Sequence, residues 1–136
     1  MRQIITAKTI SDPIWKIFDI KPVQPIVDTE QFQALQFMVA NMAMNIEAAR
    51  ALTYQTASLY DSGYHGIDLI TKASMAKCFA SDLCMRVTTD VVQIFGGYGY
   101  MKDYPVERMM RDAKLLSIIE GTSQIHHHII ARNLLS

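Results

Sequence analysis

Apolar and small residues recur along positions 28–61 at alternating spacings of three and four, which is the period of one face of an α-helix. Asp28 has the side chain of a helix N-cap residue, and Gly63 stands where a glycine commonly ends a helix. The pattern therefore predicts a long amphipathic helix over about residues 28–61. Its stripe consists of Phe32, Leu35, Val39, Met42, Ile46, Ala49, Thr53, Thr56 and Tyr60.

A second stripe of the same period predicts another long helix from about Gly66 to Ile94, and it is rich in small residues. Small side chains let two helix backbones approach closely. Lys77 is the one charge on this stripe, and the run "GGYGY" follows its end. The stripe consists of Ile70, Ala73, Ala76, Lys77, Ala80, Leu83, Val87, Val91 and Ile94.

Two shorter helices complete the pattern. One begins after Pro105, which suits a first helical turn, and continues through "VERMMRDAKLL". The other begins near Gly121 and Thr122 and continues to the C-terminus. Because no proline interrupts residues 26–104 and the connections are short, we expect an all-α fold: an antiparallel bundle of about four helices, two long and two shorter. Residues 1–25 receive no clear assignment, and residues 26–136 form the expected bundle domain.

Composition narrows the class of protein. Of the 136 residues, 50% are hydrophobic, and 13 basic side chains balance 13 acidic ones. Binding driven by net charge to nucleic acid or to an anionic membrane is therefore not expected. No run of apolar residues is long enough to span a membrane, and the N-terminus lacks the apolar core of a signal peptide.

Cysteines and histidines give no metal-binding motif. Cys78 and Cys84 are six apart on a predicted helix, so they point to different faces and cannot form a disulfide within it. The simplest setting is a reduced, cytoplasmic one. No Cys or Cys/His spacing predicts zinc. His126, His127 and His128 are consecutive on a helix, so their side chains fan out and cannot converge on one metal ion.

One carboxylate stands out. Glu120 lies in the stretch "LLSIIEGTSQI", between Ile119 and Gly121, in strongly apolar company. It is either an ordinary acid before a helix, with Thr122 or Ser123 as the N-cap, or a base kept in a dry site. Apolar surroundings disfavour the charged form of a carboxyl group and so raise its pKa toward the range of a general base.

Two other polar or glycine-rich stretches have ordinary explanations. The glycines of "VQIFGGYGY" are typical of a helix C-terminus with a tight turn, although they also allow a flat ligand to approach the backbone. The stretch follows no strand, so it is no phosphate-binding GxGxxG loop. Glu107 and Arg111 are spaced for an ion pair on a solvated helix face.

Several of these stretches, taken in order, closely resemble the C-terminal domain of the acyl-CoA dehydrogenase family. They are "FQALQFMVANMAMNIEAARALTYQTA", "KASMAKCFASDLCMRVTTDVVQIFGGYGYMKDYPVERMMRDAKLLSIIEGTSQI" and "IIARNLL". The resemblance covers roughly residues 26–136. In that family, a helical C-terminal bundle holds FAD together with an N-terminal helical domain and a middle β-domain.

The resemblance implies a role for particular residues. Glu120 matches the family's catalytic base, which removes the proton next to the thioester carbonyl of an acyl-CoA while a hydride passes to the flavin, giving a trans-2-enoyl-CoA. Gly121 is expected to lie over the substrate. The expected FAD contacts are Phe32, Gln33, Gln93, Ile94, Phe95, Gly96, Gly97, Thr122, Ser123 and Gln124.

The family's N-terminal and middle domains have no counterpart in this sequence. We therefore expect a homodimer, a tetramer or a partner chain that carries the missing domains, with electron-transferring flavoprotein as the acceptor of electrons. The alternatives are a non-catalytic helical interaction module, an inactive remnant of such an enzyme, or a related flavin oxidase.

Overall fold

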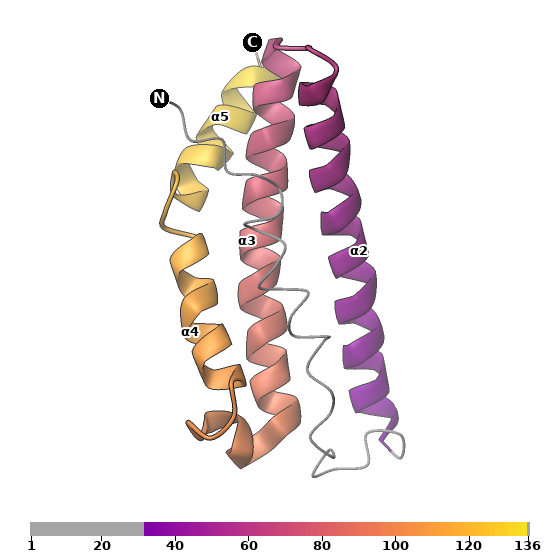
Figure 1. Cartoon of the computed structure of the whole chain (residues 1–136), viewed down its shortest axis with the longest axis vertical. Helices are drawn as coiled ribbons and strands as arrows, with labels where there is room; N and C mark the ends of the chain where they lie inside the picture. Colours follow the sequence, from indigo (N-terminus) through magenta and orange to yellow (C-terminus); the bar gives the residue numbers. More distant parts are fainter. Residues whose placement is uncertain (1–31, 136) are drawn as a thin grey trace.

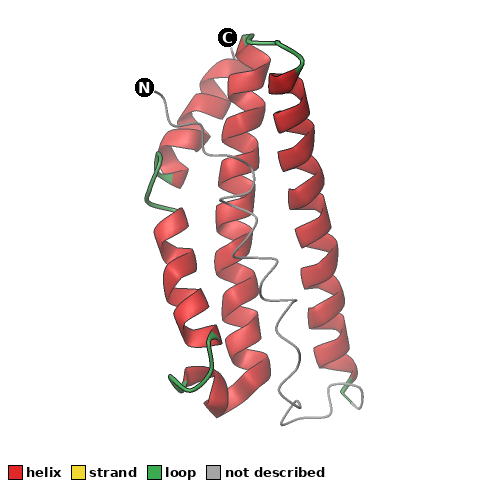
Figure 2. Cartoon of the chain, in the orientation of Figure 1, coloured by secondary structure: helices red, strands yellow, loops and turns green. Residues whose placement is uncertain are grey.

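The computed structural model describes residues 32–135, which form four α-helices and one short 3-10 helix (Figures 1 and 2). This part of the chain contains no strand, so the expected all-α fold, with two long and two shorter helices, is confirmed. The elements in chain order are α2 (Gln33–Asp61), α3 (Ile67–Phe95), η2 (Gly96–Tyr100), α4 (Val106–Leu116) and α5 (Ser123–Leu135).

The helix ends follow the local signals of the sequence. Helix α2 ends at Asp61, and Gly63 has a φ of 80°, a conformation that favours glycine and stops the helix. Helix α3 lies within one residue of its predicted bounds, and α4 begins directly after Pro105. Helix α2 begins at Gln33, because Phe32 has an extended backbone, so the predicted start near residue 28 was wrong. Asp28 and the unassigned segment 1–25 lie outside the described residues.

The helices form three columns, and α3 is the middle one. Helix α2 runs antiparallel to α3 on one side, and α4 and α5 follow one another along the other side (Figure 1). Within residues 32–135, the backbone of α3 lies close to those of α2, α4 and α5, whereas the backbone of α2 lies close to neither α4 nor α5. The four helices of the predicted bundle therefore share three columns, because the short connection from α4 to α5 continues in the same direction instead of reversing.

The apolar core lies where α2, α3 and α4 meet. Alanines and other short side chains of α3 allow this close approach, as the small-residue stripe predicted. Some members of the predicted stripes, such as Val39, Tyr60 and Ile70, remain exposed because no described element covers them. The buried cluster consists of Met42, Ile46 and Ala49 from α2, Ala80, Leu83, Cys84, Val87 and Val91 from α3, and Val106 and Ala113 from α4.

In the part of the chain that the structure describes, no helix is both long enough and apolar enough to cross a membrane.

Candidate functional site

The connection between α4 and α5 has a strained backbone at Glu120. Glu120 has a φ of 54° and Gly121 a φ of 92°, so two consecutive residues adopt the left-handed region. This region costs a residue with a side chain about 1–2 kcal/mol, and it persists only where the surroundings hold it in place. The connection is closed by a hydrogen bond of 3.1 Å from the Ser123 N–H to the Ser117 carbonyl. Such strain at a single acidic residue is typical of a functional position.

Lys77 fixes this turn from helix α3. Its side chain is almost buried, and its Nζ donates a hydrogen bond of 2.5 Å to the carbonyl oxygen of Gly121. Burial lowers the pKa of Lys77, while the nearby acidic groups of Cys78, Asp82 and Glu120 act in the opposite direction. A buried ammonium group needs such partners, because desolvation without them is costly. The one charge on the predicted α3 stripe thus ties α3 to the turn that carries Glu120.

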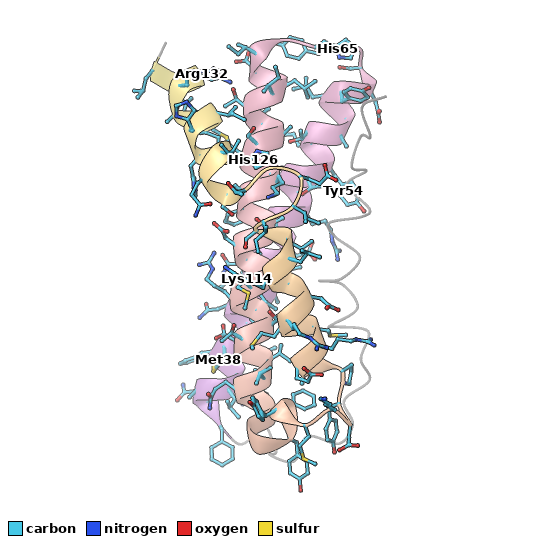
Figure 3. All side chains as sticks on the ribbon, turned by 90° about the vertical axis from the view of Figure 1, so that its left-hand side faces the viewer. Met38, Tyr54, His65, Lys114, His126 and Arg132 are labelled. Carbon is cyan, nitrogen blue, oxygen red and sulfur yellow. The ribbon has the colours of Figure 1, made fainter. Side chains whose placement is uncertain are left out.

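His126 packs against the same turn from the first part of α5 (Figure 3). Its Nε2 lies 3.2 Å from the carbonyl oxygen of Glu120. A side-chain carbon added at Gly121 would lie only 2.8 Å from this Nε2. Glycine is therefore favoured at this position by its φ, and a side chain there would also require the imidazole of His126 to shift. The Nδ1 of His126 is buried and finds no hydrogen-bond partner within residues 32–135.

The first turn of α5 is capped and anchored by two hydroxyl groups. The Thr122 hydroxyl oxygen accepts a hydrogen bond of 3.3 Å from the Ile125 N–H, so the expected capping at this helix start is confirmed. Ser123 is buried, and its hydroxyl donates a hydrogen bond of 3.1 Å to the Oδ1 atom of Asp82. Gln124 lies exposed beside them.

The carboxylate of Glu120 is open to solvent. Glu120 is exposed, and the preceding Ile118 and Ile119 are 53% and 41% exposed. The dry surroundings that the sequence suggested are therefore not formed by residues 32–135. What this part of the chain provides is a carboxylate on a strained turn with a fixed backbone, beside two isoleucines that have no cover.

The other residues expected to bind FAD lie near one end of the molecule. Phe32 and Gln33 begin α2 at the same end where α3 finishes with Gln93–Gly97 (Figure 1). Gly96 ends α3 with a φ of 57°, so the ordinary interpretation of "GGYGY" as a helix end with a tight turn is confirmed. Gln93 lies about 16 Å along α3 from Asp82, which contacts the start of α5. The expected site residues thus form two separate groups.

Three residues that anchor this turn were not predicted as site residues from the sequence: Lys77, Asp82 and His126. Only Lys77 had a detectable signal, a charge on an otherwise apolar stripe. Asp82 and His126 had none, because what distinguishes them is a contact made in three dimensions. The predicted pair Glu107–Arg111 is present, with 3.8 Å between its charged atoms, and lies on α4 away from the turn.

Comparison with known proteins places the chain in a family. Residues 26–135 match the family described as "Acyl-CoA dehydrogenase, C-terminal domain". The chain is 55% identical over 105 residues to the cyclohexane-1-carbonyl-CoA dehydrogenase of Geobacter metallireducens, covering 77% of this chain and 27% of that protein. It is 48% identical over 104 residues to the CarC subunit of the caffeyl-CoA reductase–Etf complex of Acetobacterium woodii, covering 76% of this chain and 27% of that subunit.

A solved structure agrees with the sequence comparison. The butyryl-CoA dehydrogenase of Megasphaera elsdenii superposes with a TM-score of 0.77 at 40% identity, covering 96% of this chain and 33% of that one. This chain spans about a quarter of the length of the curated relatives that it matches. It belongs to the acyl-CoA dehydrogenase family, of which it is a C-terminal domain.

Proposed function

From its membership of the acyl-CoA dehydrogenase family, we propose that this chain is the base-bearing part of an FAD-dependent enzyme that converts an acyl-CoA thioester to a trans-2-enoyl-CoA. The observation that carries the proposal is the turn at Glu120. Its backbone has a φ of 54°, and Lys77 and His126 lie against the carbonyl groups of Gly121 and Glu120. The backbone held in this way fixes the point from which the Glu120 side chain leaves the turn, and such positioning favours proton abstraction.

In this reaction, Glu120 takes the proton from the carbon next to the thioester carbonyl and becomes a neutral carboxylic acid. That carbon acid is far weaker than a carboxylic acid, so the barrier must fall by stabilising the charge that develops on the carbonyl oxygen. The backbone N–H of Glu120 is the donor that this chain offers for that oxygen. Gly121, which has no side chain, leaves the approach of the thioester to the carboxylate open.

FAD supplies the acceptor for the hydride that leaves the next carbon of the acyl chain. The residues present fit such a flat, extended cofactor. Gly96 and Gly97 are exposed, and a side-chain carbon added at either would meet no atom within 4 Å, so a ring system can reach the backbone there. Thr122 and Gln124 at the start of α5 provide polar groups beside a helix N-terminus, where phosphate binds readily. Ser123, whose hydroxyl already donates to Asp82, positions this turn.

Part of the site comes from outside residues 32–135. Ile118, Ile119 and Glu120 are exposed, and catalysis by a carboxylate requires that water be excluded around it. We infer that a chain carrying the N-terminal and middle domains covers this surface, with acyl-CoA between them, in an assembly of two or four copies. Because one relative is named as a subunit of an Etf complex, electron-transferring flavoprotein is the proposed electron acceptor.

The test is to produce the full chain together with a chain that carries the N-terminal and middle domains, and to record the flavin absorption spectrum before and after adding acyl-CoA. We expect a flavin that bleaches with substrate. In Glu120→Gln, the flavin should bind as before, while the bleaching rate falls at least about 10³-fold because the base is lost. Glu107→Gln, which removes an acid from α4, should bleach at the original rate. Equal bleaching by Glu120→Gln and the original complex would refute the role of Glu120.

A second candidate function is a helical interaction module without catalysis. It is favoured by the exposure of large apolar side chains on α2, where Phe37, Met44 and Tyr54 are 58%, 63% and 58% exposed. Such a surface is typical of a protein–protein contact. If this function is correct, the two co-produced chains bind each other and their complex contains no flavin. Glu120→Gln then changes neither the binding of the two chains nor the absence of flavin.

A further inference from the structure

Three side chains that can bind a metal ion meet between α3 and α5. Cys78 and Asp82 lie one helical turn apart on α3, and His127 reaches them from α5. The Sγ atom of Cys78 lies 3.4 Å from the Nε2 atom of His127 and 3.9 Å from the Oδ2 atom of Asp82. All three potential ligand atoms lie within 4.8 Å of one another. The group lies outside the expected FAD and substrate contacts, apart from its hydrogen bond to Ser123.

The thiol of Cys78 lies beside three polar atoms. Besides Asp82 Oδ2 and His127 Nε2, the carbonyl oxygen of Ser123 lies 3.8 Å from its sulfur. A thiol has one proton and can donate one hydrogen bond. The Nε2 atom of His127 is a donor or an acceptor according to the tautomer of the ring, and as an acceptor it presents a lone pair to the same place as the sulfur and the Asp82 carboxylate, an arrangement that a cation can satisfy.

The neighbouring hydrogen bonds hold the ligands in place. The Ser123 hydroxyl donates to Oδ1 of Asp82, which leaves Oδ2 as the carboxylate oxygen on the side of the sulfur. Bound metal ions commonly have ligands oriented by such outer hydrogen bonds. Burial raises the pKa of the Cys78 thiol and the charge of Asp82 raises it further, while the nearby ammonium of Lys77 favours the thiolate.

The chemistry of the ligands selects the ion. We propose that Cys78, Asp82 and His127 bind one zinc-like divalent ion, with the fourth position filled by water. Sulfur, imidazole nitrogen and carboxylate oxygen are the ligands that Zn²⁺ takes in proteins, with metal–ligand distances of about 2.0–2.3 Å. In a tetrahedral site, these bonds place the sulfur roughly 3.6 Å from each of the other two ligand atoms. The observed 3.4 Å and 3.9 Å differ from that value by a few tenths of an ångström.

A metal ion bound at this site would hold the first turn of α5 against α3. Ser123 and His127 lie on that turn or directly after it, and Asp82 and Cys78 belong to the central helix. A bound ion would therefore fasten α5 to α3 and stabilise the fold by its binding free energy. It would do so whether or not the chain takes part in acyl-CoA dehydrogenation, so this inference does not depend on the proposed function.

The test uses the full metal-free chain and Co²⁺ as a coloured substitute for Zn²⁺. We expect one Co²⁺ per chain, an absorption band from thiolate-to-cobalt charge transfer, and visible bands of tetrahedral intensity that Zn²⁺ abolishes by displacement. Addition of Zn²⁺ should raise the melting temperature, and a chelator should reverse the rise. His127→Gln, at an exposed position, should weaken Co²⁺ binding at least about 100-fold, since it removes a ligand. Cys78→Ser should remove the charge-transfer band.

Two control variants distinguish this site from binding elsewhere. Cys84 is buried in the apolar core, where burial raises the pKa of its thiol to about 11, and Cys84→Ser should keep the cobalt spectrum. His128→Gln changes the exposed neighbour of His127 and should keep the affinity. The proposal is overturned if Co²⁺ gives no thiolate band, or if His128→Gln weakens binding as much as His127→Gln does.

Discussion

Helices α2 and α3 have the same length, 29 residues, and both have the stripe of an amphipathic helix, but the fold uses them very differently. Thirteen residues of α3 are buried, against four of α2. Helix α3 has neighbours on two sides, whereas within residues 32–135 the backbone of α2 lies close to that of α3 alone. The number of buried residues therefore follows the position of a helix among the columns.

The difference extends to polar contacts. Helix α3 provides Lys77 and Asp82, which hold the turn with Glu120 and the start of α5. On α2, Phe37 and Met44 lie seven residues apart on one side of the helix, exposed. The side of the molecule near α5 is thus organised by this chain itself, while the outer side of α2 is suited to contact with another protein part.

The largest contrast should come from two apolar side chains on opposite faces of α2. Ile46 is 2% exposed and Met44 is 63% exposed. Ile46→Ala should lower the free energy of unfolding by about 2–5 kcal/mol, because it leaves a cavity in the core. Met44→Ala should change it by no more than about 0.5 kcal/mol. Urea denaturation measures both. Similar values for the two variants would mean that the outer face of α2 is covered in solution.

The next effect concerns the buried cation on α3. Lys77→Met should cost about 1–3 kcal/mol of stability, because it leaves the Gly121 carbonyl without its donor. Hydrogen exchange should also become faster at the amide of Ser123, whose N–H closes the turn. Lys72→Met, on the same helix at a more exposed position, is the control and should do neither. If both lysine variants behave alike, Lys77 does not hold the turn.

Gly121→Ala should destabilise the chain by about 1–3 kcal/mol, since a φ of 92° is strained for alanine and the added carbon meets His126. Gly97→Ala, where the added carbon meets nothing, should have a much smaller effect. Combining Gly121→Ala with His126→Ala separates the two causes in a double-mutant cycle. The second substitution should recover the steric part of the loss and leave the backbone part. Full additivity would rule out the contact with His126.

The smallest effect on stability, and the sharpest test of the exposed face, is Phe37→Glu. The free energy of unfolding should change by less than about 0.5 kcal/mol, because the side chain is 58% exposed. Self-association or binding of a partner chain, followed by light scattering, should weaken by about tenfold or more, since a charge enters an apolar contact. Gln55→Glu, which adds the same charge at another exposed position of α2, controls for net charge. Unchanged association in Phe37→Glu would exclude this face as the contact.

Much of the local structure followed from the sequence because its causes are local. Gly63 and Pro105 bound their helices as expected, since glycine readily adopts a positive φ and proline has a fixed φ that suits the start of a helix. Thr122 caps α5 because its hydroxyl oxygen accepts a hydrogen bond from a backbone N–H of the first turn. The family was also recognisable from ordered motifs, and the match over residues 26–135 agrees with it. The roles of Glu120 and of the expected FAD contacts stay predictions, which the Glu120→Gln experiment addresses.

The sequence by itself determined the number and type of the described α-helices and most of their bounds, apart from the start of α2, because hydrophobic period, caps and breakers act within a few residues of the chain. Only the tertiary structure decided that α4 and α5 share one column, that Lys77 binds the carbonyl of Gly121, and that Cys78 lies beside His127. These contacts join residues 44 and 49 positions apart. Their formation depends on how the helices pack, and no local pattern of side chains encodes which distant atoms will meet.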